Sequence, residues 1–314
     1  MSTFHSLNRR SFLKSAAIGT AMISASSKPV SASEIKEPRF LFGGFTKTLQ
    51  LLELSYEEVA EAAAEIGWDG IEFPVRPGGH VLPERVEEDL PLVMEALKKN
   101  NVKMLVMVTG IHNPGEPHTE KVLRTASKLG IKRYRIGYWM YQQNIPIPDQ
   151  LNEIKPQIRD LAALNKELGM CGIYQNHSGR NYVGAPIWDL YELIKDVDSR
   201  YIASNFDIGH ATVEGGYSWP IQYQLIRSFI GSILVKDFTW AQTPGKGGAV
   251  GWCPLGEGIL DKSFFKMLLD SGYSGPVSQH FEYEVEAKTR TEHIRNRIEG
   301  MKRDGATLRK LLQV

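Results

Sequence analysis

Imidazole, carboxylate, amide and amino side chains recur in this sequence at the ends of short apolar runs, which are typical of buried strands. These residues are Glu72, His80, Gln175, His177, Asp207, His210, Lys236, His280 and Glu282. Imidazoles and carboxylates transfer protons near neutral pH, and they are also ligands for divalent metal ions. A single histidine or aspartate at a strand end usually serves the local structure, so only a shared location would indicate a catalytic site.

The elements that would bring these side chains together alternate along the chain. Runs rich in Val and Ile, several of them with little alternation, are separated by amphipathic helical stretches, as expected of parallel strands covered by helices. The runs are 39–43, 70–73, 103–108, 133–137, 172–175, 202–207, 231–236 and 276–281. Eight strand–helix units predict one (β/α)8 TIM barrel over residues 33–314, with functional side chains at the C-terminal ends of its strands.

Helical signals lie between these runs. Ser55-Tyr56-Glu57-Glu58 is a capping box that opens the first predicted helix. The helical stretches are 55–65, 84–99, 119–129, 148–168, 186–197 and 260–269, and the basic stretch 288–310 is typical of a solvated helix face. A doubly wound open sheet is the structural alternative, but Gly43-Gly44-Phe45-Thr46 lacks the spacing of a phosphate-binding turn. The cluster Gly245-Lys246-Gly247-Gly248 is typical of a mobile loop over the barrel mouth.

The first 32 residues have the features of an export signal. Asn8-Arg9-Arg10-Ser11-Phe12-Leu13-Lys14 matches the twin-arginine pattern, a weakly apolar run covers 16–25, and Val30-Ser31-Ala32 forms a small-x-small cleavage site. We therefore expect residues 1–32 to be a twin-arginine signal peptide and the remaining chain to reach the periplasm already folded. A frayed N-terminal arm with two chance arginines is the alternative.

The composition is that of an ordinary globular protein, with 42% hydrophobic and 23% charged residues among 314. Lys and Arg number 37 against 36 Asp and Glu, and residues 1–32 hold four of the basic side chains and no acidic one, so the rest is slightly acidic. This balance argues against nucleic acid as a partner. No apolar stretch is long enough to span a bilayer, so no stable membrane association is expected. Two cysteines cannot form a disulfide framework, and the oligomeric state, a homo-oligomer included, stays open.

Several motifs at the predicted strand ends resemble a known family. They are Tyr174-Gln175-Asn176-His177, Phe206-Asp207-Ile208-Gly209-His210, Val235-Lys236-Asp237-Phe238, Pro254-Leu255-Gly256-Glu257-Gly258 and Gly272-Tyr273-Ser274-Gly275-Pro276. Over most of residues 39–312 the sequence resembles the xylose isomerase-like barrel superfamily of sugar isomerases, epimerases and endonuclease IV relatives. The resemblance implies a divalent metal ion at the barrel mouth, ligands from strands five to eight, and chemistry next to a sugar carbonyl. Endonuclease activity is disfavoured, because it would need a His-rich trinuclear site and a basic surface.

The motifs depart from the family pattern at two ligand positions. Gln175 stands where the family usually has a glutamate, and Leu234 stands where it usually has a histidine. On the eighth strand, where a glutamate ligand is usual, the inward candidates are His280 and Glu282, which share a face because they are two residues apart. The resemblance thus implies a remodelled site for Mn, Mg, Co or Zn, with Gln175, Asp207 and His280 as ligands and Glu282 as a fourth ligand or a base.

The reaction that these residue types favour is proton abstraction beside a carbonyl group. Glu282 or His177 is the candidate base, and His210 or Lys236 is the candidate acid. The absence of a carboxylate at Gln175 argues against a two-base epimerase mechanism. An isomerase, an epimerase and a lyase therefore all remain candidate activities.

The export signal, together with the lack of a phosphate-binding motif, predicts an unphosphorylated sugar or a keto-glycoside as the small-molecule substrate. Glu72, His80 and Trp240 are the candidate substrate-binding residues, and the indole ring could stack on a sugar face. The alternative function is a barrel that has lost catalysis and binds carbohydrate, which Gln175 and Leu234 support.

Overall fold

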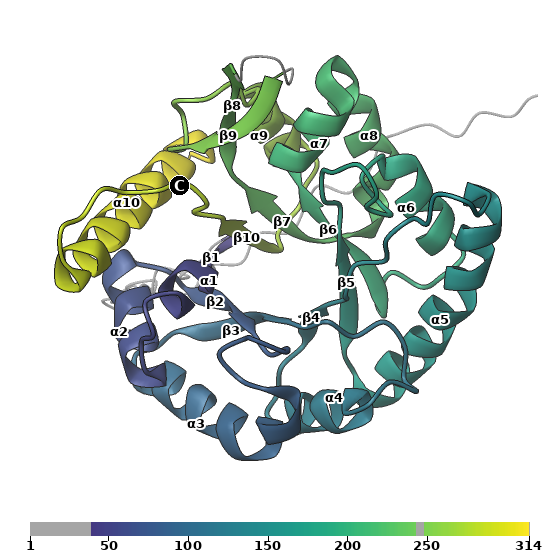
Figure 1. The fold of residues 1–314 in the computed structure, drawn as a ribbon, viewed down its shortest axis with the longest axis horizontal. Helices are drawn as coiled ribbons and strands as arrows, with labels where there is room; N and C mark the ends of the chain where they lie inside the picture. Colours follow the sequence, from purple (N-terminus) through teal and green to yellow (C-terminus); the bar gives the residue numbers. More distant parts are fainter. Residues whose placement is uncertain (1–38, 243–247, 314) are drawn as a thin grey trace, which may run out of the picture. The chain divides into compact units, whose positions relative to one another are not determined.

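The computed structural model of the chain describes residues 39–242 and 248–313. The predicted export signal, residues 1–32, and most of the glycine cluster lie outside these ranges. Eight parallel strands close into a barrel in the order β1-β10-β7-β6-β5-β4-β3-β2, which confirms the predicted (β/α)8 TIM barrel and excludes the open sheet (Figure 1). The barrel strands are β1 (Leu41–Phe45), β2 (Gly70–Pro74), β3 (Lys103–Val108), β4 (Arg133–Arg135), β5 (Cys171–Gln175), β6 (Ile202–Asp207), β7 (Ile230–Val235) and β10 (Pro276–Gln279).

Helices surround the barrel strands (Figure 1). They are α1 (Lys47–Gln50), α2 (Tyr56–Ile66), α3 (Val86–Lys99), α4 (Thr119–Lys128), α5 (Ile147–Leu168), α6 (Ile187–Ile194), α7 (Ile208–Gly215), α8 (Trp219–Ile226), α9 (Ser263–Asp270) and α10 (Arg290–Leu311). The predicted capping box begins α2, because Ser55 Oγ accepts a hydrogen bond from the Glu58 amide while the Glu58 carboxylate accepts one from the Ser55 amide. None of the described helices combines the length and the apolar character needed to cross a membrane.

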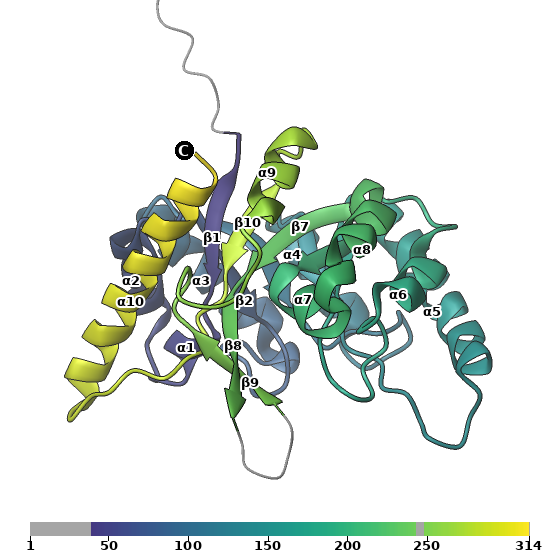
Figure 2. The same cartoon turned by 90° about the horizontal axis from the view of Figure 1, so that it is seen from above.

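An antiparallel hairpin that the sequence pattern did not predict follows β7. Its strands, β8 (Asp237–Gln242) and β9 (Gly248–Cys253), flank the glycine cluster and form a separate two-stranded sheet. Figure 2 shows this hairpin projecting from the barrel on the side opposite the C-terminus of the chain. Because β8 starts two residues after the end of β7, the hairpin borders the barrel end at which the strands finish.

Alternate residues of each barrel strand face the surrounding helices or the barrel interior. Outward residues such as Phe73, Tyr174 and Phe206 belong to the large apolar core between strands and helices. Inside the barrel, Phe45 and Val108 belong to a much smaller apolar cluster. Apart from Leu234 on β7, inward positions near the ends of several strands, among them Glu72, Gln175 and Asp207, carry polar side chains, so the barrel interior leads into a polar site.

Candidate active site

A layer of buried polar side chains closes the C-terminal end of the barrel. It consists of Glu72 on β2, Arg135 on β4, Gln175 on β5, Asp207 on β6 and His280 directly after β10. Closure of the barrel therefore brings together four residues that the sequence predicted. Arg135 was not predicted as a site residue, although a charged residue inside a predicted buried strand could have indicated it.

Gln175 is held at both ends of its amide group. Its Oε1 accepts hydrogen bonds from Arg135 Nη1 at 2.9 Å and from the Tyr138 hydroxyl at 2.6 Å. Its Nε2 donates to Asp207 Oδ2 at 2.9 Å. This network sets the orientation of the amide, because only the NH2 group can donate to a carboxylate. The amide oxygen thus points away from Asp207.

Lys236 lies between the end of β7 and the start of β8, and its amino group is buried in the site. Its Nζ is 3.3 Å from Asp207 Oδ2, 3.2 Å from Glu282 Oε1 and 2.8 Å from His210 Nε2. The Lys236 side chain is only 2% exposed, and Nζ lies 4.3 Å from the centroid of the Trp252 ring. Two of these contacts are hydrogen bonds, to Glu282 and His210, and the contact with Asp207 is an ion pair.

Gly209 makes room for this lysine. A Cβ atom at position 209 would lie 2.9 Å from both Lys236 Cγ and the Lys236 carbonyl oxygen. Contacts this close essentially never occur, so the absence of a side chain at 209 is what lets Lys236 pass along the start of α7.

Backbone contacts position Asp207 independently of its charged partners. Its Oδ1 caps α7 by accepting from the His210 amide at 2.9 Å, and Asn176 bonds both the amide and the carbonyl of Asp207. Burial opposes ionisation of this carboxyl, but Lys236, His280 and the hydrogen bond from the His210 amide outweigh it and lower the pKa of Asp207. The site therefore contains a rigidly held carboxylate.

His177 and His210 stack on each other at this end of the barrel, with ring centroids 4.0 Å apart. Burial lowers the pKa of His210 well below its ordinary value, and burial together with Lys236 lowers the pKa of His177. Both rings are therefore neutral near pH 7. Because an ammonium can only donate, His210 Nε2 accepts from Lys236, and its Nδ1–H faces Ser178 Oγ at 2.7 Å.

His177 has the opposite arrangement of its ring nitrogens. Its Nδ1 lies 2.8 Å from the Ser178 carbonyl oxygen, which can only accept, so Nδ1 carries the proton. Nε2 then carries a lone pair, and no described residue hydrogen-bonds to it. His177 is thus the neutral imidazole of this site with an unengaged basic nitrogen.

His280 links two carboxylates. Its Nε2 is 3.3 Å from Glu72 Oε2 and its Nδ1 is 3.5 Å from Glu282 Oε1. Burial favours the neutral ring, but Glu282 and Glu72 outweigh it and raise the pKa of His280. Burial also opposes ionisation of Glu282, yet Lys236 and His280 hold the pKa of that carboxyl well below its ordinary value.

Two predicted substrate-binding residues lie away from this cluster. His80 stacks on Phe73 with ring centroids 4.6 Å apart, and its Nε2 is 3.3 Å from the Thr46 carbonyl oxygen. Trp240 is 46% exposed on β8, where it lines a cavity of about 540 Å³ with Tyr217 and residues of α7 and α8. Their predicted role stays a prediction, whereas Glu72 lies inside the cluster.

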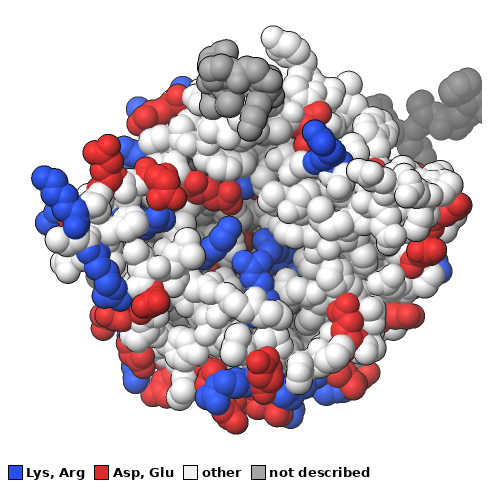
Figure 3. Space-filling model, viewed as in Figure 1, with Lys and Arg blue, Asp and Glu red and all other residues white. Residues whose placement is uncertain are grey.

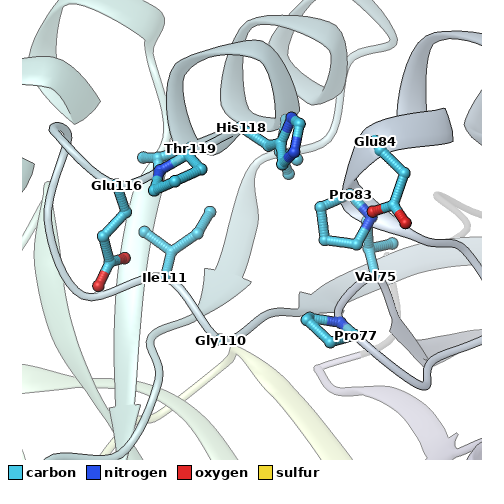
Figure 4. Close-up of a pocket in the computed structure, with 11 residues that line it drawn as sticks. Val75, Pro77, Pro83, Glu84, Gly110, Ile111, Glu116, His118 and Thr119 are labelled. Atoms are coloured by element: carbon cyan, nitrogen blue, oxygen red, sulfur yellow. The ribbon is translucent and has the colours of Figure 1, made fainter.

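A second cavity, of about 360 Å³, lies between the segments that follow β2 and β3 (Figure 4). Figure 4 shows it bordered by Val75, Pro77 and Pro83 on one side and by Ile111 and His118 on the other. None of the residues in the polar layer lines it. Its lining is mainly apolar, so the chemistry indicated above belongs to the barrel end and not to this cavity.

The carboxylates of the polar site have positively charged or imidazole partners within the chain itself. Lys236 pairs with Asp207 and Glu282, His280 pairs with Glu72, and Arg135 bonds the Gln175 amide. Burial and the nearby Arg135 lower the pKa of Arg76. Lys and Arg side chains are visible in the hollow at the centre of this face of the molecule (Figure 3).

The metal ion implied by the resemblance does not fit these donors. Such an ion needs several oxygen or nitrogen ligands around one point at about 2.0–2.3 Å. In the described ranges no three His, Cys, Asp or Glu side chains converge in this way. Of the predicted ligands, Gln175 turns its nitrogen towards Asp207, and His280 pairs with Glu72. The amino group of Lys236 lies between the carboxylates instead.

Comparison with known proteins agrees with this architecture. A D-psicose 3-epimerase from Clostridium cellulolyticum H10 superposes with a TM-score of 0.65 at 13% identity, covering 87% of this chain and 98% of that one. A 3-keto-D-glucoside 4-epimerase from E. coli gives 0.62 at 15% identity, covering 84% and 99%. A probable 3-DHS dehydratase from Bacillus anthracis gives 0.63 at 16% identity, covering 85% and 98%. At such identities these similarities show the fold alone.

Sequence comparison adds the family. None of the curated proteins matches the sequence significantly. A family model described as xylose isomerase-like TIM barrel matches residues 60–310, which is most of the chain and includes every residue of the polar site described above. The chain therefore belongs to the xylose isomerase-like TIM barrel family.

Proposed function

We propose that the chain is an isomerase, epimerase or lyase that moves a proton at the carbon beside a carbonyl group of an unphosphorylated sugar or keto-glycoside. The observation that carries the proposal is the pairing, in one buried polar site, of a basic nitrogen and a cationic donor. His177 Nε2 is free to accept a proton, and Lys236 Nζ is linked to it through the stacked ring of His210.

In this proposal His177 is the base. Its Nε2 takes the proton from the carbon beside the carbonyl, the electron pair of the C–H bond becomes the new C=C bond, and the π pair of the carbonyl group moves onto its oxygen to give an enediolate. Lys236 faces the oxygen on which this charge develops, which is the arrangement that stabilises such an anion. Transfer of the His177 proton to the neighbouring carbon, with the hydroxyl proton passing to the former carbonyl oxygen, gives an isomer. Protonation of the opposite face by water, while His177 releases its proton to solvent, gives an epimer. Expulsion of a β-oxygen that takes the proton from His177 gives an elimination product.

Glu282 is the weaker of the two candidate bases. Burial opposes its ionisation, but Lys236 and His280 lower its pKa, and a carboxylate that is stabilised in this way accepts a proton poorly. His210 already accepts a hydrogen bond from Lys236 through Nε2. These two residues therefore orient Lys236 in the proposal and do not exchange protons with substrate.

Several lines support an unphosphorylated sugar as substrate. The structurally similar proteins include epimerases named for D-psicose and for a 3-keto-D-glucoside. Residues 1–32 carry the predicted twin-arginine signal, which would place the enzyme in the periplasm, where sugar phosphates are not the common metabolites. Localisation would be tested by fractionating cells that express the chain with Arg9 and Arg10 intact or both replaced by lysine.

The proposal is tested by hydrogen exchange from deuterated solvent into a panel of free sugars and 3-keto-glycosides. The wild-type chain should label the carbon beside the carbonyl of at least one of them. His177→Asn should abolish the labelling. The matched control is His118→Asn at the separate cavity, which should retain it, since asparagine tolerates the left-handed backbone at this position.

Labelling that persists in His177→Asn would refute the assigned base. Binding of a sugar by the wild-type chain without labelling of any substrate would instead favour the second candidate, a barrel that binds carbohydrate without catalysis. The replacements at Gln175 and Leu234 are the observation that keeps this candidate open.

A further inference from the structure

Lys236 occupies the position between carboxylates at which a divalent ion would bind. Its ammonium group donates hydrogen bonds to Glu282 Oε1 at 3.2 Å and His210 Nε2 at 2.8 Å, and it forms an ion pair with Asp207 Oδ2 at 3.3 Å. An ion bridging the same carboxylates would lie within contact distance of a like charge with almost no solvent between them, since the lysine side chain is 2% exposed. The ammonium and the ion therefore exclude each other.

Two further positions agree with this exclusion. Gln175 presents its NH2 group to Asp207, and its amide oxygen is already used by Arg135 and Tyr138. Leu234, at the last inward position of strand β7, is fully buried, and its side chain has no atom that could bind a metal ion. Neither position therefore presents a free oxygen or nitrogen ligand to a divalent ion.

We infer that Lys236 is the resident cation of this site and that the site works without a divalent metal ion. Its ammonium group binds the carbonyl oxygen of the substrate directly, in exchange for one of its present acceptors. Glu282 is the acceptor that gives way, because its side chain is 25% exposed while Asp207 and His210 are enclosed. Its contact with His280 keeps the released carboxylate in place. The substrate half of this inference rests on the proposed function; the exclusion of metal does not.

The exclusion is tested on the purified full chain by metal analysis and calorimetry. The wild-type chain, dialysed with MnCl2 and then against metal-free buffer, should retain no stoichiometric Mn²⁺, and neither Mn²⁺ nor EDTA should change its melting temperature. A chain with Gln175→Glu, Leu234→His and Lys236→Gln together restores the ligand types. It should gain at least about tenfold in bound Mn²⁺ per chain.

Stoichiometric Mn²⁺ binding by the wild-type chain, with a rise in melting temperature, would overturn the inference. If the wild-type and the rebuilt chain, shown by circular dichroism to be folded, both fail to bind, the three residues are not what excludes the ion. If the rebuilt chain does not fold, the single variant Lys236→Gln takes its place, and it too should bind more Mn²⁺ than the wild type.

Exchange activity separates this inference from the proposed function. Hydrogen exchange into a sugar that is unchanged by EDTA supports both. Exchange that EDTA abolishes and Mn²⁺ restores would overturn the metal-free site while the proposed function stands. Absence of exchange with every substrate would count against the proposed function, and the Mn²⁺-binding result would still decide the metal question.

Discussion

Replacing Lys236 with methionine removes the positive charge that two buried carboxylates share and keeps a similar apolar length. Asp207 and Glu282 lie 3.3 and 3.2 Å from the lysine nitrogen. Removing one partner of a buried ion pair costs about 3–5 kcal/mol, because the remaining charge has no compensation. With an unfolding entropy of about 2.1 cal/mol/K per residue over the described part of the chain, this loss lowers the melting temperature by about 5–9 °C.

The sign of the pH dependence follows from the carboxylates. Lys236 helps to lower the pKa of both Asp207 and Glu282, although burial opposes this. Carboxyls with a lowered native pKa stabilise the fold above their unfolded pKa of about 4, and this contribution is lost as the pH falls towards the native value. The difference in the free energy of unfolding between wild type and Lys236→Met should therefore be largest at pH 7 and should decrease as the pH falls below about 4.

The measurement is urea denaturation followed by circular dichroism at several pH values. Lys195→Met is the matched control, because Lys195 forms an exposed pair with Glu192 on α6 and its loss should be small. If Lys236→Met unfolds at the same urea concentration as Lys195→Met at pH 7, Lys236 does not compensate the buried carboxylates, and the charge argument is refuted.

Three further outcomes are expected. Gln175→Glu places a second carboxylate beside the buried aspartate, so the pair should retain a proton in the native state and the variant should lose stability between pH 5 and 8 in urea denaturation relative to wild type. Burial raises the pKa of Asp304 to about 6, so the native state binds a proton that the unfolded chain has released, and the fold loses stability as the pH rises from about 4 to about 6. Asp304→Asn should flatten this part of the stability profile, and an unchanged profile would count against the assignment. Gly209→Ala should displace Lys236, lower the free energy of unfolding by about 1–3 kcal/mol and abolish the exchange activity. Gly110→Ala, where a Cβ atom meets nothing within 4 Å, should change neither the free energy of unfolding nor the activity.

Most barrel strands and the end of the barrel that carries the site could be predicted from the sequence. Apolar runs identify buried strands because burial on both faces is a local property of each segment. The rule that function gathers at the C-terminal strand ends then selected Glu72, Gln175, Asp207, Lys236 and His280, which the structure places together. The hairpin of β8 and β9 was not predicted, since it follows β7 with almost no turn signal in between.

Contacts between side chains from different strands could not be predicted in this way. Strand register in the closed barrel decides that Arg135 reaches Gln175, and that Lys236 rather than a metal ion lies between Asp207 and Glu282. The free nitrogen of His177 likewise depends on a carbonyl group that only the folded backbone presents. The sequence by itself determined which residues are buried at the barrel end, because that pattern is local. Tertiary structure decided which atoms meet, because barrel closure sets the distances between segments that are far apart in the chain.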